Sequence, residues 1–173
     1  MEIKTPRLTL RPAGPEYLDS THAYASDPEA TRFMMFLPVD SREETLRFLE
    51  DAAEEWRKPV PACREFAILI GGEHVGGISL FGLEGEPDGA ELGWIVRKDR
   101  WRQGIAREAA EALMAYAARE WGFRRFIAQC DGENTASFRL MEKLGMRRIG
   151  AATGRKNRGS DEERVELTYE RVL

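Results

Sequence analysis

The chain has 173 residues, about the size of one domain with a buried core, and we expect residues 1–173 to form a single domain. Its 26 basic and 30 acidic residues give a net charge of -4, which argues against a general nucleic-acid binder because such proteins carry a basic stripe. The two cysteines lack metal-ligand spacing and indicate reduced thiols, so we expect no metal site. No apolar run is long enough for a signal peptide or a membrane span. We therefore expect a cytoplasmic protein with no membrane partner.

The spacing of apolar residues predicts a chain of alternating strands and helices. Apolar residues at every second position, closed by Gly or Pro, indicate strands, and apolar residues at every third or fourth position indicate helices. Ser41 and Glu44 have the spacing of a capping box, which predicts a helix start. The acidic face of that helix is expected to be solvated. The connector "MMFLP" at residues 34–38 is compatible with a cavity wall or with core.

In chain order, the expected elements are a strand at 7–12, helices at 15–27 and 40–56, strands at 64–72, 73–83 and 89–99, a helix at 102–120, a strand at 125–130, a helix at 134–144, and strands at 146–153 and 164–173. The polar segment "GRKNRGSDEE" at residues 154–163 is expected to be a loop. Strands first, then alternating helices and strands, predict a mixed α/β sheet of the α+β type, flanked by helices.

The segment "RWRQGIAREA" leads from a strand into a long helix through Gly104. Free backbone N–H groups and the positive end of the helix dipole meet at such a point and favour an anion. Gly104 has no Cβ to block a ligand, and Ala106 is small. Arg102 and Gln103 can add side-chain donors. The segment matches neither G-x-x-x-x-G-K-[ST] nor G-x-G-x-x-G, and by itself it also fits a plain helix start.

Three stretches together carry a more specific signal: "AELGWIV", "RWRQGIAREA" and "ENTASFRLMEKLGMRRIG". They resemble the general N-acetyltransferase (GNAT) superfamily, in particular the branch that includes ribosomal-protein N-terminal acetyltransferases. "RLTLRP" and "DPEATRFMMFLP" are similar to the N-terminal signature of that branch. The resemblance implies the acyl-CoA N-acyltransferase fold with a mostly antiparallel sheet, acetyl-CoA as cosubstrate, and acetyl transfer to a primary amine.

The resemblance also implies a set of cofactor-binding residues. The family's pyrophosphate loop reads Gln/Arg-x-x-Gly-x-Gly/Ala, and Gly104 and Ala106 match its last fixed positions. Trp101 stands at its first position, which leaves open whether Arg102 or Gln103 supplies the missing side chain. The residues implied to bind acetyl-CoA are Val96 through its backbone to the pantetheine arm, Arg102, Gln103, Gly104, Ile105 and Ala106 at the pyrophosphate, and Asn134 and Ser137 near the sulfur.

Amine acetylation needs a neutral amine, and Glu91 is the candidate that handles it. At pH 7 an α-amine is about 14% neutral and a lysine side chain about 0.04%, so an α-amine needs only a weak or water-relayed base. Strand alternation puts Glu91 and Gly93 on one face of the sheet and Leu92 and Trp94 on the other. Glu91 matches the fourth-strand glutamate that serves as base in parts of the family. A cross-strand ion pair or a solvated edge position is the alternative for this carboxylate.

Ser137 is the candidate partner of the coenzyme A sulfur. Many superfamily members use a tyrosine on the last helix to protonate the thiolate, but Met141 occupies that position here. In the branch that this chain resembles, N-x-x-S at the start of this helix faces the sulfur, and Asn134 and Ser137 share one helix face. Asn134 is also the expected N-cap. Whether Ser137 or water protonates the thiolate stays open.

We therefore expect an acetyl-CoA-dependent N-acetyltransferase that transfers directly in a ternary complex, most simply to the α-amine of a protein or peptide. Two alternatives remain: acetylation of a small amine such as a polyamine or an aminoglycoside, and an acyl-CoA-binding sensor without turnover. No nucleic acid is expected as a partner, and the sequence leaves a homodimer open.

Overall fold

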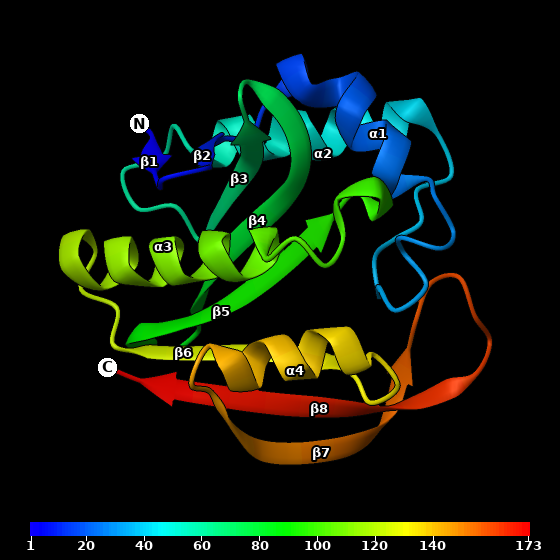
Figure 1. Cartoon of the computed structure of the whole chain (residues 1–173), viewed down its shortest axis with the longest axis vertical. Helices are drawn as coiled ribbons and strands as arrows, with labels where there is room; N and C mark the ends of the chain where they lie inside the picture. Colours follow the sequence, from blue (N-terminus) through cyan, green and yellow to red (C-terminus); the bar gives the residue numbers. More distant parts are fainter.

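The computed structural model describes residues 1–173, and its centre is one eight-stranded sheet in the order β1-β2-β3-β4-β5-β6-β8-β7 (Figure 1). β5 and β6 run parallel, whereas every other pair of neighbours is antiparallel. The strands are β1 (Ile3–Lys4), β2 (Thr9–Pro12), β3 (Cys63–Ile70), β4 (Glu73–Leu83), β5 (Glu86–Val96), β6 (Arg125–Asp131), β7 (Arg147–Lys156) and β8 (Glu163–Val172). The expected mixed, mostly antiparallel sheet is confirmed.

Four α-helices cover the sheet, two on each face (Figure 1). They are α1 (Leu18–Ala25), α2 (Arg42–Glu55), α3 (Ile105–Glu120) and α4 (Thr135–Lys143), with short 3-10 turns η1 (Pro15–Tyr17) and η2 (Lys98–Arg100). α1 and α2 contact β3 and β4 on one face, whereas α3 and α4 lie over β4, β5, β6 and β8 on the other. None of the helices combines the length and hydrophobicity that a membrane span requires.

Several element boundaries differ from the sequence prediction for local reasons. The two-residue β1 was not expected. It is a strand because it pairs with β2, and two residues are too few to show an alternating pattern of apolar and polar residues. The helix expected from residue 102 begins at Ile105, since Gly104 adopts a left-handed φ of 76° and caps it. The loop expected at 154–163 is shorter, because β7 continues to Lys156 and β8 starts at Glu163.

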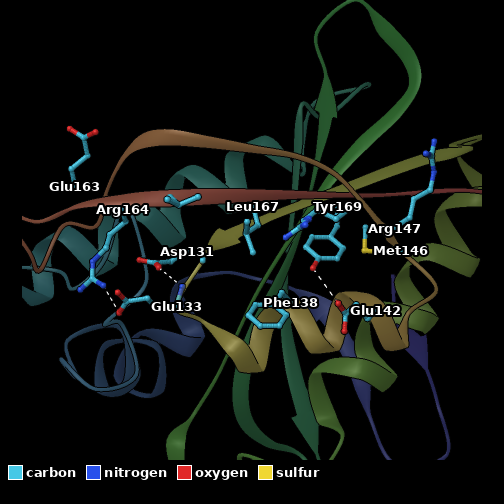
Figure 2. Close-up of a pocket in the computed structure, with 13 residues that line it drawn as sticks. Asp131, Glu133, Phe138, Glu142, Met146, Arg147, Glu163, Arg164, Leu167 and Tyr169 are labelled. Carbon is cyan, nitrogen blue, oxygen red and sulfur yellow. Dashed lines mark hydrogen bonds and ion pairs between the residues drawn. The ribbon is translucent and has the colours of Figure 1, made fainter.

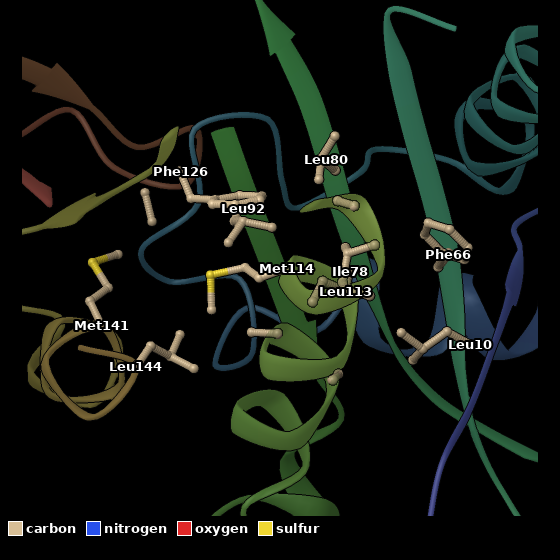
Figure 3. Packing of buried hydrophobic residues seen from close by; sticks show 14 of the residues in the cluster. Leu10, Phe66, Ile78, Leu80, Leu92, Leu113, Met114, Phe126, Met141 and Leu144 are labelled. Carbon is tan, nitrogen blue, oxygen red and sulfur yellow. The ribbon is translucent and has the colours of Figure 1, made fainter. Parts of the chain in front are cut away.

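The two faces of the sheet are packed very differently. A cluster of 26 buried residues fills the space under α3 and α4, and Figure 3 shows Leu92, Leu113, Met114 and Phe126 within it. The cluster that packs α2 against the other side of the fold has only three buried members. Except for Val75, the residues that β3 to β5 contribute to the large core are even-numbered, and most odd-numbered ones face the opposite side, where the buried hydrophobic cluster is small.

β5 and β6 separate along their length. Their paired residues run only from Gly89 with Arg125 to Leu92 with Ala128, although β5 continues to Val96 and β6 to Asp131. β5 remains paired with β4 as far as Val96. The last part of β5 therefore has one free edge, and this gap between neighbouring strands lies in the middle of the sheet.

We predict that the stability of the fold depends on the α3 side of the sheet. Leu113 is fully buried, so Leu113→Ala should lower the free energy of unfolding by about 2–5 kcal/mol in urea titrations. Val60 is 81% exposed, so Val60→Ala should change it by less than about 0.5 kcal/mol. Equal losses in the two variants would contradict this assignment of the core.

Candidate active site

A cavity of about 1480 Å³ is lined by residues from both faces of the sheet and from both strands of the β5–β6 gap. On the α3 and α4 side it reaches Gly104, Ser137 and Cys130, and on the α1 and α2 side it reaches Tyr24 and Glu65. The free edge of β5 thus lies between two halves of one cavity. Two reactants can approach from opposite faces and meet at this gap.

The turn before α3 forms the most polar end of the α3-side half. Arg102 and Gly104 both have positive φ, 60° and 76°, which turns successive N–H groups toward one side of the chain. No N–H group of residues 102–107 donates to a backbone carbonyl. These free donors and the positive end of the α3 dipole suit a diffuse anion such as a diphosphate. Glycine is needed here chiefly because of its φ, since an added Cβ would make only an ordinary contact with Arg7.

Side chains from two distant segments hold this turn in place. Trp101 donates from Nε1 to the carbonyl oxygen of Val96 at 2.7 Å, which ties the turn to the end of β5. Arg7 donates from Nη1 to the carbonyl oxygen of Gln103 at 3.0 Å and forms an ion pair with Glu108 at 2.6 Å. The side chain of Gln103 itself turns back to the carbonyl of Asp99 and does not line the cavity. Of the two side chains predicted as alternatives, only Arg102 lines it.

The α3-side half of the cavity is also rich in cationic side chains: Arg100, Arg102, Arg107, Arg139 and Lys143 line it. Arg100 pairs with Glu73, and Arg107 with Glu111 at 2.9 Å. The remaining three make no ion pair within the chain, so their charge is available to a polyanion.

Asn134 and Ser137 lie where α4 begins, beside Cys130 of β6. Asn134 caps α4, and its Oδ1 accepts from the backbone N–H of Ser137 at 3.1 Å, as predicted for an N-cap. Burial raises the pKa of the Cys130 thiol to about 11, and the neighbouring Ser137 hydroxyl opposes part of that shift. All three residues line the cavity at the β5–β6 gap.

Glu91 lies half-buried on β5, where β5 and β6 are about to separate, and faces the α1 and α2 side. Burial raises the pKa of its carboxyl, the nearby Glu166 raises it further, and Arg155 opposes both. A carboxylate with a raised pKa is a stronger base than an exposed one.

Sequence reasoning missed Arg155 and Glu166, which the pairing of β7 with β8 brings together. Arg155 forms an ion pair with Glu166 at 2.7 Å and donates to the carbonyl oxygen of Phe33 at 2.9 Å. It therefore holds the residue directly before the 34–38 connector, most of which lines the cavity as the sequence allowed. Arg155 lies in the segment expected to be a loop, and its polar composition gave no signal of a buried partner.

A second hollow of about 850 Å³ lies between α4 and the strands β7 and β8 (Figure 2). Its polar groups largely satisfy one another: Arg164 pairs with Glu133, and the Tyr169 hydroxyl donates to Glu142 at 3.3 Å. None of the residues predicted to bind or react lines it. The cavity at the β5–β6 gap is therefore the candidate active site.

The sequence of residues 7–147 matches the family described as "Acetyltransferase (GNAT) domain". The chain belongs to the GNAT acetyltransferases. It is 32% identical over 153 residues to the uncharacterized N-acetyltransferase YnaD of Bacillus subtilis, a match that covers 87% of this chain and 85% of YnaD. The GNAT acetyltransferase structure from Bacillus anthracis is 29% identical, with a TM-score of 0.84 and coverage of 99% of this chain and 98% of that one.

The fold is shared with more distant GNAT proteins. A ribosomal L7/L12 α-N-protein acetyltransferase, RimL, solved with coenzyme A, has a TM-score of 0.88 at 22% identity, with coverage of 100% of this chain and 98% of that chain. As a GNAT acetyltransferase, the chain uses acetyl-CoA as acetyl donor, and its free N–H groups and unpaired cations fit the phosphates of that cosubstrate. No group of three or more potential metal ligands accompanies the site.

We predict that a negative side chain in the α3 turn weakens cosubstrate binding. Gly104→Glu should raise the Kd for acetyl-CoA at least tenfold in calorimetry, because the carboxylate repels the diphosphate. Gly122→Glu is the matched control, since Gly122 ends the same helix with a φ of 78° and open space around it. Both variants should lose about 1 kcal/mol of stability from the positive φ. Equal Kd values for the two variants would place the diphosphate elsewhere.

Proposed function

We propose that this GNAT acetyltransferase acetylates the α-amine at the N-terminus of a peptide or protein. The observation that carries the proposal is the mouth of the α1 and α2 half of the cavity. Four exposed apolar side chains line it: Met35, Phe36, Phe48 and Phe81. Phe36 is 81% exposed. A wide apolar rim suits the first residues of a polypeptide chain better than a compact, highly hydroxylated sugar.

The chemistry of the proton supports an α-amine. Deprotonation of a lysine side chain at pH 7 costs about 3.5 kcal/mol more free energy than deprotonation of an α-amine, so lysine requires a stronger base. Glu91 is the one half-buried carboxylate on β5 at the gap, and no second base is paired with it. A single carboxylate of raised pKa, directly or through a water molecule, is adequate for an amine that is already partly neutral.

In this proposal each part of the cavity has one task. Arg102 and the free N–H groups of residues 102–107 hold the diphosphate, and the free edge of β5 near Val96 binds the pantetheine arm. Glu91 takes the proton of the attacking amine on the opposite face of the sheet. Ser137 donates a hydrogen bond to the sulfur. RimL, an α-N-protein acetyltransferase of ribosomal L7/L12, has an acceptor of this class.

The acceptor class can be tested directly with three matched peptides. One has a free α-amine and no lysine, the second has an acetylated α-amine and one lysine, and the third has neither amine free. We expect thiol release from acetyl-CoA only with the first, and mass spectrometry should place the acetyl group on its α-nitrogen. Turnover confined to the lysine peptide, or to an aminoglycoside, would overturn the proposal.

The role of Glu91 gives a second prediction. Glu91→Gln should lower kcat for the free-amine peptide by roughly 10²-fold while leaving the Kd for acetyl-CoA unchanged. Because the pKa of Glu91 is raised, the wild-type rate should begin to fall, as pH drops, at a higher pH than an exposed glutamate would cause. Glu50→Gln, on the exposed face of α2, is the control and should behave as wild type. An unchanged kcat in Glu91→Gln would remove Glu91 from the reaction.

Ser137 offers a third prediction, which separates the two sources of the thiolate proton. If the hydroxyl only orients the sulfur and water donates the proton, Ser137→Ala should lower kcat less than about tenfold. If the hydroxyl is the acid, the loss should approach 10²-fold or more. Single-turnover kinetics, with the enzyme in excess over acetyl-CoA, measures this step.

A further inference from the structure

Glu65 on β3 is a carboxylate for which the chain provides no charged partner. Burial raises its pKa to about 7, and its one side-chain hydrogen bond comes from the Cys63 thiol, a weak donor, at 3.5 Å. The titratable groups that interact with it are Cys63 and Tyr24 of α1, and neither of them is a cation. Glu65 is half-buried. A carboxylate that is partly withdrawn from water is costly unless it is paired, so a positively charged partner that arrives with a ligand would stabilise it.

The position of Glu65 is fixed by its backbone. Its carbonyl oxygen accepts from Trp56 Nε1 at 2.8 Å and from the Ala13 N–H at 2.9 Å. In the sheet Glu65 stands opposite Ser79 of β4, and Ser79 stands opposite Gly93 of β5. Residues opposite one another point to the same face, so the Glu65 side chain points into the same half of the cavity as Glu91.

Between Glu65 and β5 the cavity wall has little side-chain bulk and is polar. A Cβ on Gly93 would lie 2.8 Å from Ser79 Oγ, so only glycine leaves this space clear. The Tyr24 hydroxyl lies 3.4 Å from the place of a Cβ on Gly77. The hydroxyl of Thr21, which is 3% exposed and also lines the cavity, has no hydrogen-bond partner. Free hydroxyls and a carboxylate are acceptors that match the three N–H donors of an ammonium.

We propose that Glu65 binds a second positively charged nitrogen of the acceptor, one that is not acetylated. This inference rests on the proposed function of the cavity as an amine site and adds a requirement on the acceptor. β3 lies two strands, about 10 Å, from β5, and farther still from the free edge of β5. A nitrogen bound at Glu65 is therefore remote from the acetyl group, and its ion pair persists while Glu91 handles the reacting amine.

Two acceptor types carry this chemistry: a peptide whose second residue is lysine, and a free aliphatic diamine. The test compares matched pairs that differ in one charge, Ser-Lys against Ser-norleucine peptides and 1,8-diaminooctane against 1-octylamine, since the two nitrogens of each doubly charged member are nine bonds apart. We expect the wild type to prefer the doubly charged member of at least one pair by tenfold or more in kcat/KM. Glu65→Gln should remove that preference through KM, with kcat nearly unchanged, whereas Glu50→Gln should keep it.

Binding provides a readout that does not depend on turnover. Calorimetry of the same pairs on the coenzyme A-loaded protein should show the same tenfold preference in the wild type and its loss in Glu65→Gln. Turnover of diamines alone would overturn the peptide proposal and leave the Glu65 site standing. Turnover of both peptides without preference, together with equal Kd values in both pairs, would overturn the Glu65 site. A Glu65→Gln variant that loses stability but retains the preference would show that Glu65 has only a structural role.

Discussion

The separation of β5 from β6 is the constraint on which the rest of this structure depends. Backbone N–H and C=O groups inside a sheet are normally paired, and leaving them unpaired in a buried place is unfavourable. Here the two strands share residue pairs only as far as Leu92 and Ala128, and the rest of β5 keeps its bonds to β4 alone. The free edge can be satisfied by an extended ligand arm. The gap also gives the two faces of the sheet their single point of communication.

The sheet divides the cavity into halves of opposite charge. On the α3 and α4 side, Arg102, Arg139 and Lys143 have no partner within the chain, which matches the phosphates of acetyl-CoA. On the α1 and α2 side, Glu65 and Glu91 have raised pKa values and no ion pair, which matches an amine. A polyanion and a cation are thus drawn to different faces. The hydrophobic packing is also unequal, since the cluster of 26 buried residues lies under α3 and α4 and the cluster on the other face has three.

Local patterns in the sequence predicted much of the fold because they have local causes. The alternation along "AELGWIV" placed Glu91 and Leu92 on opposite faces, and the N-cap at Asn134 follows from its own side chain. The glycine turn before α3 was also found, although its reason is the positive φ of Gly104 rather than space alone. These features need only a few neighbouring residues.

The parts that the sequence could not supply depend on residues far apart along the chain. The ion pair of Arg155 with Glu166 requires the register of β7 against β8, and the contact of Arg155 with Phe33 spans most of the chain. Glu65 was visible as an acid within an apolar strand, but only the sheet register shows that it shares a face with Glu91. The spacing of apolar residues does not predict a cavity either, because a residue that lines a cavity and a residue in a packed core can be equally apolar.

In the proposed site, the contact of Arg7 with the α3 turn links the first residues of the chain to the segment that would bind the cosubstrate diphosphate. Arg7 bonds to Gln103 and Glu108, and Thr5 donates to the same glutamate at 2.5 Å. The amino-terminal segment and the diphosphate therefore stabilise one and the same backbone conformation. By thermodynamic reciprocity, whatever loosens that segment weakens the grip on the nucleotide, and a bound nucleotide in turn keeps the segment docked.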